Sequence, residues 1–441
     1  MIEALRRRAV TQRRSRALAV CLVVVLVCSC SRGFVFEQED IIVERSPGPA
    51  YDQLFPYYAE ICAVSQFRSV KKGFGGVPGH AVMYLKGACV DESTPFPQLR
   101  RCRRVATDRE DPEHGAGVSV NRWFRNVNWV GTPGRALFYA GNLEPGQRLT
   151  QEHMEATVRD AIDQGVYRGV ELHEYPTPEA ERSLEDFVTR QSLATDFALQ
   201  YGRSVFCARI PITEEMLVEA MDFLNEKNEE YATGEADYEW SGFSDNCVHT
   251  LRNALAAAGV WEPLSVRAIK FRQIFNLAIP ANEFVNLARL GTEGPIDDFG
   301  KIYGNQVQRE ALLDFDWLPT RHGALVKTLP VHTPNEVYDT TFRIFLLQSP
   351  LRQGQMRHAL RLLSDERFVD LEADLRHFAA LYDGILAERH DEGLGLASLR
   401  GDRYRRLRRR YYAYIEEQRA EVAAMLARLP GLREPELPAQ D

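Results

Sequence analysis

The sequence lacks several features that identify common classes of protein. It contains no internal repeat and no paired CxxC, the spacing found in zinc ribbons and thiol oxidoreductases. The glycines at positions 73, 75, 76 and 79 come before a strand-like segment and do not join a strand to a helix, so they are not a phosphate-binding loop. We therefore expect no metal, nucleotide or flavin cofactor.

The apolar run near the N-terminus is too short for a permanent membrane span. It extends from Ala17 to Cys28, follows six arginines in the first 16 residues, and stops at Ser31 and Arg32. It reaches only about 14 residues, whereas a membrane-spanning helix needs about 20. Because this charge order is typical of a secretory signal, we expect residues 1–29 to be a signal peptide that is removed.

The segment Leu26-Val27-Cys28-Ser29-Cys30 resembles a lipobox, the motif that directs lipid attachment to the N-terminal cysteine of bacterial lipoproteins. Its last two residues fit the pattern and predict lipidation of Cys30, and residues 30–50 then form a tether. Its second and third residues fit less well, so ordinary signal-peptidase cleavage or an uncleaved anchor remains an alternative. The expected location is the bacterial cell envelope, lipid-anchored to the membrane and facing the periplasm.

The charge balance is acidic. Removal of residues 1–29 takes away six basic residues and one acidic residue, which leaves 48 basic against 61 acidic residues. The net charge then falls from −8 to about −13. Since binding to phosphate backbones needs a basic surface, we expect no nucleic-acid partner.

The cysteines that remain after export are odd in number. They are Cys62, Cys89, Cys102, Cys207 and Cys247. An oxidising compartment favours two disulfides and one free thiol among them, and four cysteines allow three pairings. A short loop favours Cys89 with Cys102, which leaves Cys62 for Cys207. Alternatively, several of these cysteines are simply buried apolar residues.

Hydrophobic periodicity predicts an α+β fold. Strands are expected at residues 80–85, 117–120, 127–130, 136–139 and 204–210, and helices at 151–165, 179–193 and 213–229. Further helices are expected at residues 335–348, 353–363, 366–388 and 404–429. The pattern predicts a domain with a small antiparallel sheet at 51–262, followed by a mostly helical region at 263–441 that packs beside it or over its cleft.

The last of these helices carries a run of arginines. They are Arg405, Arg406, Arg408, Arg409 and Arg410. The run is typical of a solvated helix face. Its alternative is contact with acidic lipid headgroups beside the anchor.

Two segments carry residues suited to catalysis. In Val77-Pro78-Gly79-His80, a turn opens a strand whose first residue is a histidine, and period-two alternation puts His80 on one face with Val82 and Tyr84. In Ser244-Asp245-Asn246-Cys247, a turn runs into a helix that ends at Gly259. If Ser244 is the N-cap, Cys247 is the third residue of that helix.

A cysteine at this position is suited to nucleophilic attack. The positive end of the helix dipole stabilises a thiolate and lowers its pKa, an imidazole such as His80 moves the proton, and free N–H groups stabilise an oxyanion. Alternatively, Cys247 is a buried helix residue and His80 a turn residue bonded to backbone. A zinc site at Cys247 and His249 would lack two further ligands.

The Gly79-His80 and Asp245-Asn246-Cys247 pieces resemble circularly permuted papain-like proteins of the NlpC and lecithin-retinol acyltransferase superfamily, over about residues 55–260. In that group the order is histidine, polar orienting residue, then cysteine. The resemblance is greatest to bacterial envelope domains, some of them linked to lipoprotein N-acylation. It implies a thiol hydrolase or acyltransferase that uses Cys247 and His80 on a peptidoglycan peptide, a protein or a lipid acyl group.

The third residue of this group is harder to assign. Asn121 is the best candidate because it ends the next expected strand. The other candidates are Asn126, Asn128, His114 and Glu171. If the core is inert, the alternative function is an envelope scaffold or binding protein.

Overall fold

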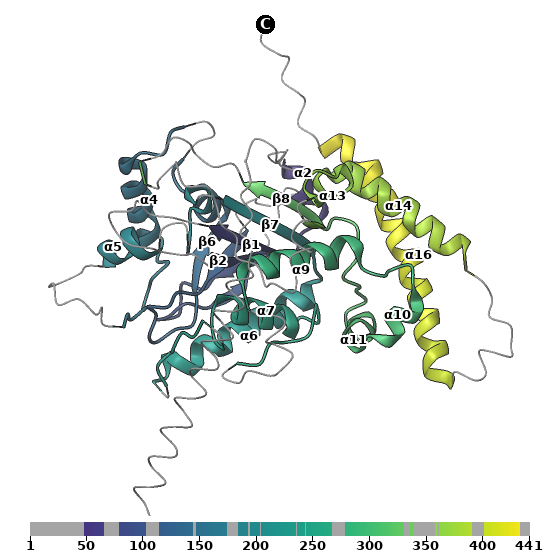
Figure 1. The fold of residues 1–441 in the computed structure, drawn as a ribbon, viewed down its shortest axis with the longest axis horizontal. Helices are drawn as coiled ribbons and strands as arrows, with labels where there is room; N and C mark the ends of the chain where they lie inside the picture. Colours follow the sequence, from purple (N-terminus) through teal and green to yellow (C-terminus); the bar gives the residue numbers. More distant parts are fainter. Residues whose placement is uncertain are drawn as a thin grey trace, which may run out of the picture.

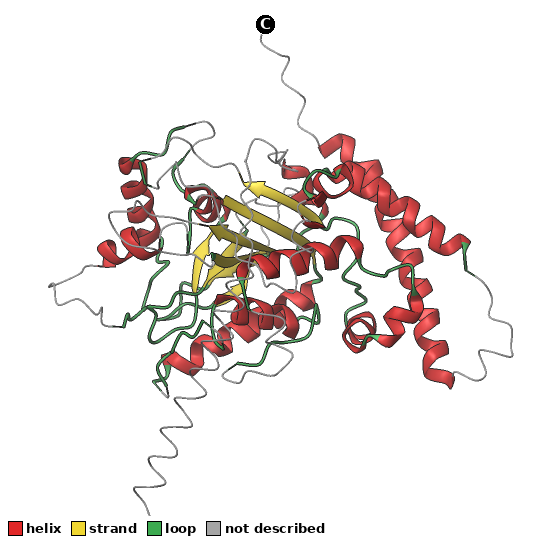
Figure 2. Cartoon of the chain, viewed as in Figure 1, coloured by secondary structure: helices red, strands yellow, loops and turns green. Residues whose placement is uncertain are grey.

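The fold was described from a computed structural model of the chain. The described residues are 48–65, 79–102, 114–143, 147–173, 184–192, 195–202, 204–234, 236–242, 244–266, 278–329, 336–337, 358–359, 361–389 and 401–432. The expected signal peptide, Cys30 and most of the tether lie outside them. Helices and an antiparallel sheet together make an α+β fold, as predicted (Figures 1 and 2).

A six-stranded antiparallel sheet forms the centre of the molecule, in the order β6-β5-β2-β1-β7-β8. Its strands are β1 (Tyr58–Ser65), β2 (His80–Lys86), β5 (Gly115–Ser119), β6 (Val130–Pro133), β7 (Ser204–Pro211) and β8 (Leu325–Leu329). A separate hairpin pairs β3 (Ala88–Val90) with β4 (Leu99–Arg101). The N-terminal strand β1 is central because it pairs with β2 on one side and with β7 on the other.

The two faces of the sheet bury different helices. Ile61 and Met83 belong to one apolar cluster, which includes residues of α6 (Glu214–Ala232), α7 (Cys247–Ala257) and α9 (Pro280–Glu293). Val82 and Tyr84 belong to a second cluster, which includes residues of α2 (Gly48–Leu54), α14 (Leu371–Ala387) and α16 (Gly401–Leu432). Because neighbouring residues of a strand point to opposite faces, the sheet separates two cores.

Several shorter helices complete the described chain. They are α3 (Arg135–Tyr139), α4 (Gln151–Asp163), α5 (Leu184–Phe187), α10 (Phe299–Gly304), α11 (Gln306–Asp314) and α13 (Glu366–Val369), with a π-helical turn at Val188–Ser192 and a 3₁₀ turn at Leu199–Tyr201. The expected strand at 136–139 is wrong, because this short apolar run forms α3. The single helix expected at 366–388 is two helices, since Asp370 caps the start of α14. Those expected at 335–348 and 353–363 lie largely outside the described residues.

The sheet extends beyond the boundary expected at residue 262. Strand β8 pairs with β7 along Val205–Arg209 and so forms the edge of the same sheet. Helix α9 contributes Phe284, Val285 and Leu287 to the first apolar cluster. The region after residue 262 therefore completes the core of the preceding one.

Both disulfides join the cysteines that loop length suggested. Cys89 is bonded to Cys102 within the β3–β4 hairpin, and Cys62 on β1 is bonded to its cross-strand partner Cys207 on β7. Cys247 is the free cysteine of the described chain. None of the described helices is both long and apolar enough to cross a membrane.

Candidate functional site

Helix α7 holds Cys247 as its first residue. Its N-cap is Asn246, whose Oδ1 accepts hydrogen bonds from the backbone N–H groups of Val248 at 2.9 Å and His249 at 3.4 Å. The expected cap at Ser244 is therefore wrong by two residues. The Ser244 hydroxyl bonds instead to Ser241 Oγ at 2.9 Å, within a tight turn that precedes the helix.

The Cys247 thiol is buried, with 7% of the residue exposed. Burial raises the pKa of this thiol to about 11, although backbone hydrogen bonds from Ala81, Val248 and Cys247 itself act in the opposite direction. The expected lowering of the thiol pKa is therefore wrong, because desolvation outweighs the helix N-terminus. At neutral pH the resting group is a thiol.

His80 begins β2 and is half-buried. Its Nε2 lies 2.9 Å from Ser119 Oγ, and that hydroxyl donates to Asp196 Oδ1 at 2.5 Å. The same hydroxyl also lies 2.8 Å from the backbone carbonyl of Thr195, which makes a hydrogen bond to the His80 ring as well. Burial lowers the pKa of His80 to about 4, so the ring is a neutral base.

Asp196 anchors this chain of hydrogen bonds from a buried position. Its Oδ2 accepts the Tyr167 hydroxyl at 2.8 Å, and the Asp196 backbone carbonyl accepts Thr132 Oγ1 at 2.7 Å. Burial raises the pKa of Asp196, although the hydrogen bonds from Ser119 and Tyr167 oppose this. The arrangement fixes the position of the His80 ring.

The sulfur and the imidazole approach β2 from different sides. Cys247 reaches the strand through the backbone hydrogen bond from Ala81, the residue after His80. Alternation turns His80 toward the face of Val82 and Tyr84, whereas α7 packs on the opposite face. Within the described chain, the His80 ring bonds to Ser119 and has no hydrogen bond to the Cys247 sulfur.

Asn121, the expected orienting residue, lies one contact away from His80. Its Nδ2 donates to Asp196 Oδ2 at 3.5 Å, and its Oδ1 accepts from the Trp123 backbone at 3.3 Å. The ring of His80 is bonded instead to Ser119, two residues earlier on the neighbouring strand. Ser119 was detectable as a polar residue inside Val118-Ser119-Val120, whereas nothing in the sequence connects Asp196 with it.

The remaining candidates serve other contacts. Asn126 accepts from the Glu171 backbone at 2.7 Å and donates to Gly169 O at 2.8 Å, and Asn128 accepts the Thr250 hydroxyl at 2.8 Å. The backbone carbonyl of His114 accepts from Gly87. These contacts hold loops and α7 in place.

His249 belongs to the cap of α7. Its Nδ1 lies 3.1 Å from Asn246 Oδ1, and burial lowers the pKa of the ring to about 4. The Nδ1 side of the His249 ring therefore faces the N-terminus of α7, where Asn246 caps the helix. No described group of metal-ligating side chains includes Cys247 and His249.

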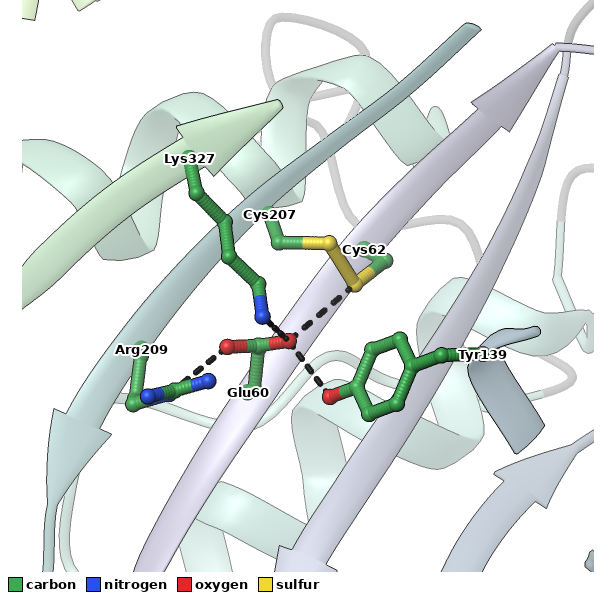
Figure 3. Close-up of a disulfide and its surroundings, with 6 residues drawn as sticks. All are labelled: Glu60, Cys62, Tyr139, Cys207, Arg209 and Lys327. Carbon is green, nitrogen blue, oxygen red and sulfur yellow. Dashed lines mark hydrogen bonds and ion pairs between the residues drawn. A yellow bond between two sulfur atoms is a disulfide. The ribbon is translucent and has the colours of Figure 1, made fainter. Parts of the chain in front are cut away.

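A second buried polar cluster lies on the sheet. Figure 3 labels its members as Glu60, Cys62, Tyr139, Cys207, Arg209 and Lys327. The Glu60 carboxylate accepts from Arg209 Nε at 2.7 Å, Lys327 Nζ at 3.1 Å and the Tyr139 hydroxyl at 2.5 Å. Burial alone would raise the pKa of Glu60, but Arg209 and Lys327 outweigh it and hold the pKa at about 2.

This cluster is suited to stability and not to metal binding. The ligand atoms of Glu60, Cys62 and Cys207 lie within 4.8 Å of one another. However, the two sulfurs are bonded to each other, and two cationic side chains already neutralise the carboxylate. A metal cation would meet neither thiolates nor a free negative charge.

Comparisons with known proteins leave the site to be interpreted from its own geometry. No family model matches the chain, and neither a curated protein nor a solved structure matches it.

Proposed function

We propose that this chain is a thiol hydrolase or acyltransferase of the circularly permuted papain-like type, with Cys247 as nucleophile and His80 as base. One observation carries the proposal. The free cysteine of the described chain begins a capped helix, and its sulfur is bonded to the peptide N–H beside a histidine whose ring is held by Ser119 and Asp196.

The proposed reaction is acyl transfer in two steps. The Cys247 sulfur attacks the carbonyl carbon of an ester, thioester or amide, and its proton passes to the imidazole of His80. The tetrahedral intermediate expels the alcohol, thiol or amine, which takes that proton, and a thioester to Cys247 remains. Water or an amine then attacks the thioester carbonyl and gives its proton to His80. The acyl product leaves, and His80 returns the proton to the Cys247 sulfur.

The pKa values favour proton transfer during the attack over a preformed ion pair. The pKa of about 11 for Cys247 and about 4 for His80 differ by about seven units. Charging both groups in the resting protein would cost about 9 kcal/mol, before their mutual attraction is counted. Because the ring lies on the Ser119 side of β2 and α7 packs on the other, the transfer also requires the backbone at the start of β2 to move. Substrate binding is the step that we expect to drive this movement.

Two groups are available to stabilise the oxyanion. The Asn246 cap engages the N–H groups of Val248 and His249 but not that of Cys247, whose weak bond to its own sulfur a substrate oxygen would replace. The Tyr238 hydroxyl is buried and has no described hydrogen-bond partner. Burial raises the pKa of Tyr238, and the charges of Asp245 and Cys247 add to this effect. Tyr238 and Cys247 belong to the same apolar cluster. We assign the Tyr238 hydroxyl as the second donor.

The proposed setting is the bacterial cell envelope. Lipidation at Cys30 would anchor the chain to the membrane with its folded part in the periplasm. The substrates available there are peptidoglycan stem peptides, protein termini and lipid acyl groups. The acidic net charge would disfavour a nucleic-acid partner in this setting.

One observation favours the alternative function, an inert envelope scaffold. The thiol is buried, its pKa is raised, and the described His80 ring makes no hydrogen bond to it. A core of this kind would hold its shape without reacting. The two functions differ in whether Cys247 ever carries an acyl group.

The deciding experiment is a search for that acyl group. The purified chain is mixed with p-nitrophenyl acetate and with longer p-nitrophenyl esters, nitrophenol release is followed, and the acylated peptide is identified by mass spectrometry. The proposal expects a thioester at Cys247 that is absent in Cys247→Ala and strongly reduced in His80→Ala. The control is His358→Ala, which removes an exposed histidine paired with Glu293. Acylation elsewhere, or none, supports the scaffold.

A further inference from the structure

The first turns of α16 carry an unusual concentration of positive charge. Six arginines lie between residues 403 and 410, namely Arg403, Arg405, Arg406, Arg408, Arg409 and Arg410. Asp402 is the only acidic residue among the first ten of this helix. This density contrasts with the net charge of −8 for the whole chain.

Three of these arginines are exposed and lie outside any described ion pair. Arg403, Arg406 and Arg409 follow one another at a spacing of three residues, which brings neighbours together on a helix surface. We call them the arginine face. Arg405 is paired with Asp402, and Arg410 is paired with Asp316 and Glu417.

The opposite side of the same turns is fixed by packing. The Tyr404 ring contacts those of Phe299 and Tyr303 at 5.2 and 5.0 Å between centroids, and the Tyr411 hydroxyl donates to Ile296 O at 2.5 Å. Figure 1 shows α16 along one edge of the molecule, with α10 and α11 beside one end and α14 beside the other. The arginine face is therefore held outward on a rigid element.

The positive charge of the arginine face destabilises the start of α16 in the isolated protein. Cations in the first turn of a helix oppose its dipole, and like charges three or four residues apart repel each other. Other exposed arginines of the helical region avoid this problem by pairing with acids, as Arg389 does with Glu416 and Arg419 with Asp383. A negatively charged surface would offset the repulsion on the arginine face.

We propose that the arginine face docks on an anionic phospholipid surface. Charge complementarity favours this occupant, because a row of exposed guanidinium groups attracts a surface of phosphate headgroups and can pair with several headgroups at once. Docking orients the whole body, since α16 is packed into the second apolar cluster through residues such as Tyr414 and Val422. The inference is independent of the proposed catalysis.

The test compares vesicles of two compositions. Partition of the full chain is measured by flotation with neutral phosphatidylcholine vesicles and with vesicles that contain about 30% phosphatidylglycerol. The ratio of the two partition coefficients cancels the apolar contribution of the N-terminal segment. The variant R403E/R406E/R409E reverses the arginine face. The control R159E/R289E/R428E makes the same change in net charge at exposed arginines of α4, α9 and the far end of α16.

The proposal expects a large effect in one variant only. Each arginine near an anionic surface contributes about a fourfold to sixfold preference, so loss of three alone should lower the ratio by about 100-fold, and their reversal by at least that much. The control should lower it by less than about tenfold, and added salt should weaken the wild-type preference. Equal losses in the two variants, or an unchanged ratio in R403E/R406E/R409E, would overturn the proposal. Circular dichroism of each variant excludes loss of the fold as the cause.

Discussion

The state of the Cys247 thiol can be measured from the pH dependence of its alkylation. Burial raises the pKa of Cys247 from 9.0 to about 11, so that about 100-fold less thiolate is present at pH 7 than in an unperturbed cysteine. Since the thiolate is the reactive form, the rate of iodoacetamide labelling should still rise about tenfold per pH unit at about pH 9.5. In urea, the same cysteine should level off near an ordinary pKa of about 8.5.

His80→Ala sharpens this measurement. With a pKa of about 4, the ring is uncharged at neutral pH and gives the thiolate no electrostatic help. Its removal should therefore leave the pH profile of Cys247 unchanged above about pH 5. The shape of the profile carries the prediction, because burial slows the reagent equally at every pH.

A labelling rate that levels off below about pH 7, and loses this plateau in His80→Ala, would refute the reasoning. It would mean that a thiolate–imidazolium pair exists before substrate binds, so that the attraction between the charges exceeds the desolvation cost. The mechanism would then begin from the ion pair. A Cys247 that labels as fast as in urea would instead refute its burial.

Four further predictions concern other residues of the site and the core. Tyr238→Phe should lower ester turnover by about 100-fold while leaving the melting temperature equal or higher, because it removes a buried hydroxyl without a described partner. Asp196→Asn should lower turnover by about tenfold or more with little change in KM, because it loosens the hydrogen bonds that orient the imidazole. Glu60 should contribute about 3 kcal/mol to the free energy of unfolding above about pH 4.5, because its pKa is lower in the folded state than in the unfolded state. This contribution should be lost as the pH falls toward about 2. Glu60→Gln should therefore flatten this part of the pH dependence of urea unfolding. Cys62→Ala/Cys207→Ala should lower the free energy of unfolding by up to about 5 kcal/mol, given a sequence separation of 145 residues, and an unchanged urea midpoint would contradict this.

The sequence predicted those parts of the fold that depend on local patterns. Strand β2 and helix α6 agree closely with the expected segments, since alternation and the Thr213 cap are local signals. The run that forms α3 was misread because four or five apolar residues fit a strand and a helix equally well. Strand β8 was missed for a related reason. All its residues are buried, including Lys327, so it shows no alternation.

The site was only partly predictable. The Gly79-His80 and Asn246-Cys247 pieces are local signals, and in the structure the Cys247 thiol is hydrogen-bonded to the backbone of Ala81, next to His80. The hydrogen bond between Ser119 and Asp196 spans 77 residues, and only the tertiary fold creates it. The thiol pKa could not be predicted either, because its direction depends on burial, which outweighs the helix N-terminus.

In an oxidising compartment, the disulfide between β1 and β7 would require cysteines to be joined out of their order in the chain. Cys89 and Cys102 lie between Cys62 and Cys207 in the chain, so joining cysteines in chain order would trap Cys62 with Cys89. Closure of the 13-residue hairpin loop removes that competitor early, because short loops close fastest. Cys247 appears last, when its four possible partners can already be bonded to one another. The thiol proposed for chemistry is thus protected by its place in the chain as well as by its burial, and faulty early oxidation would consume it.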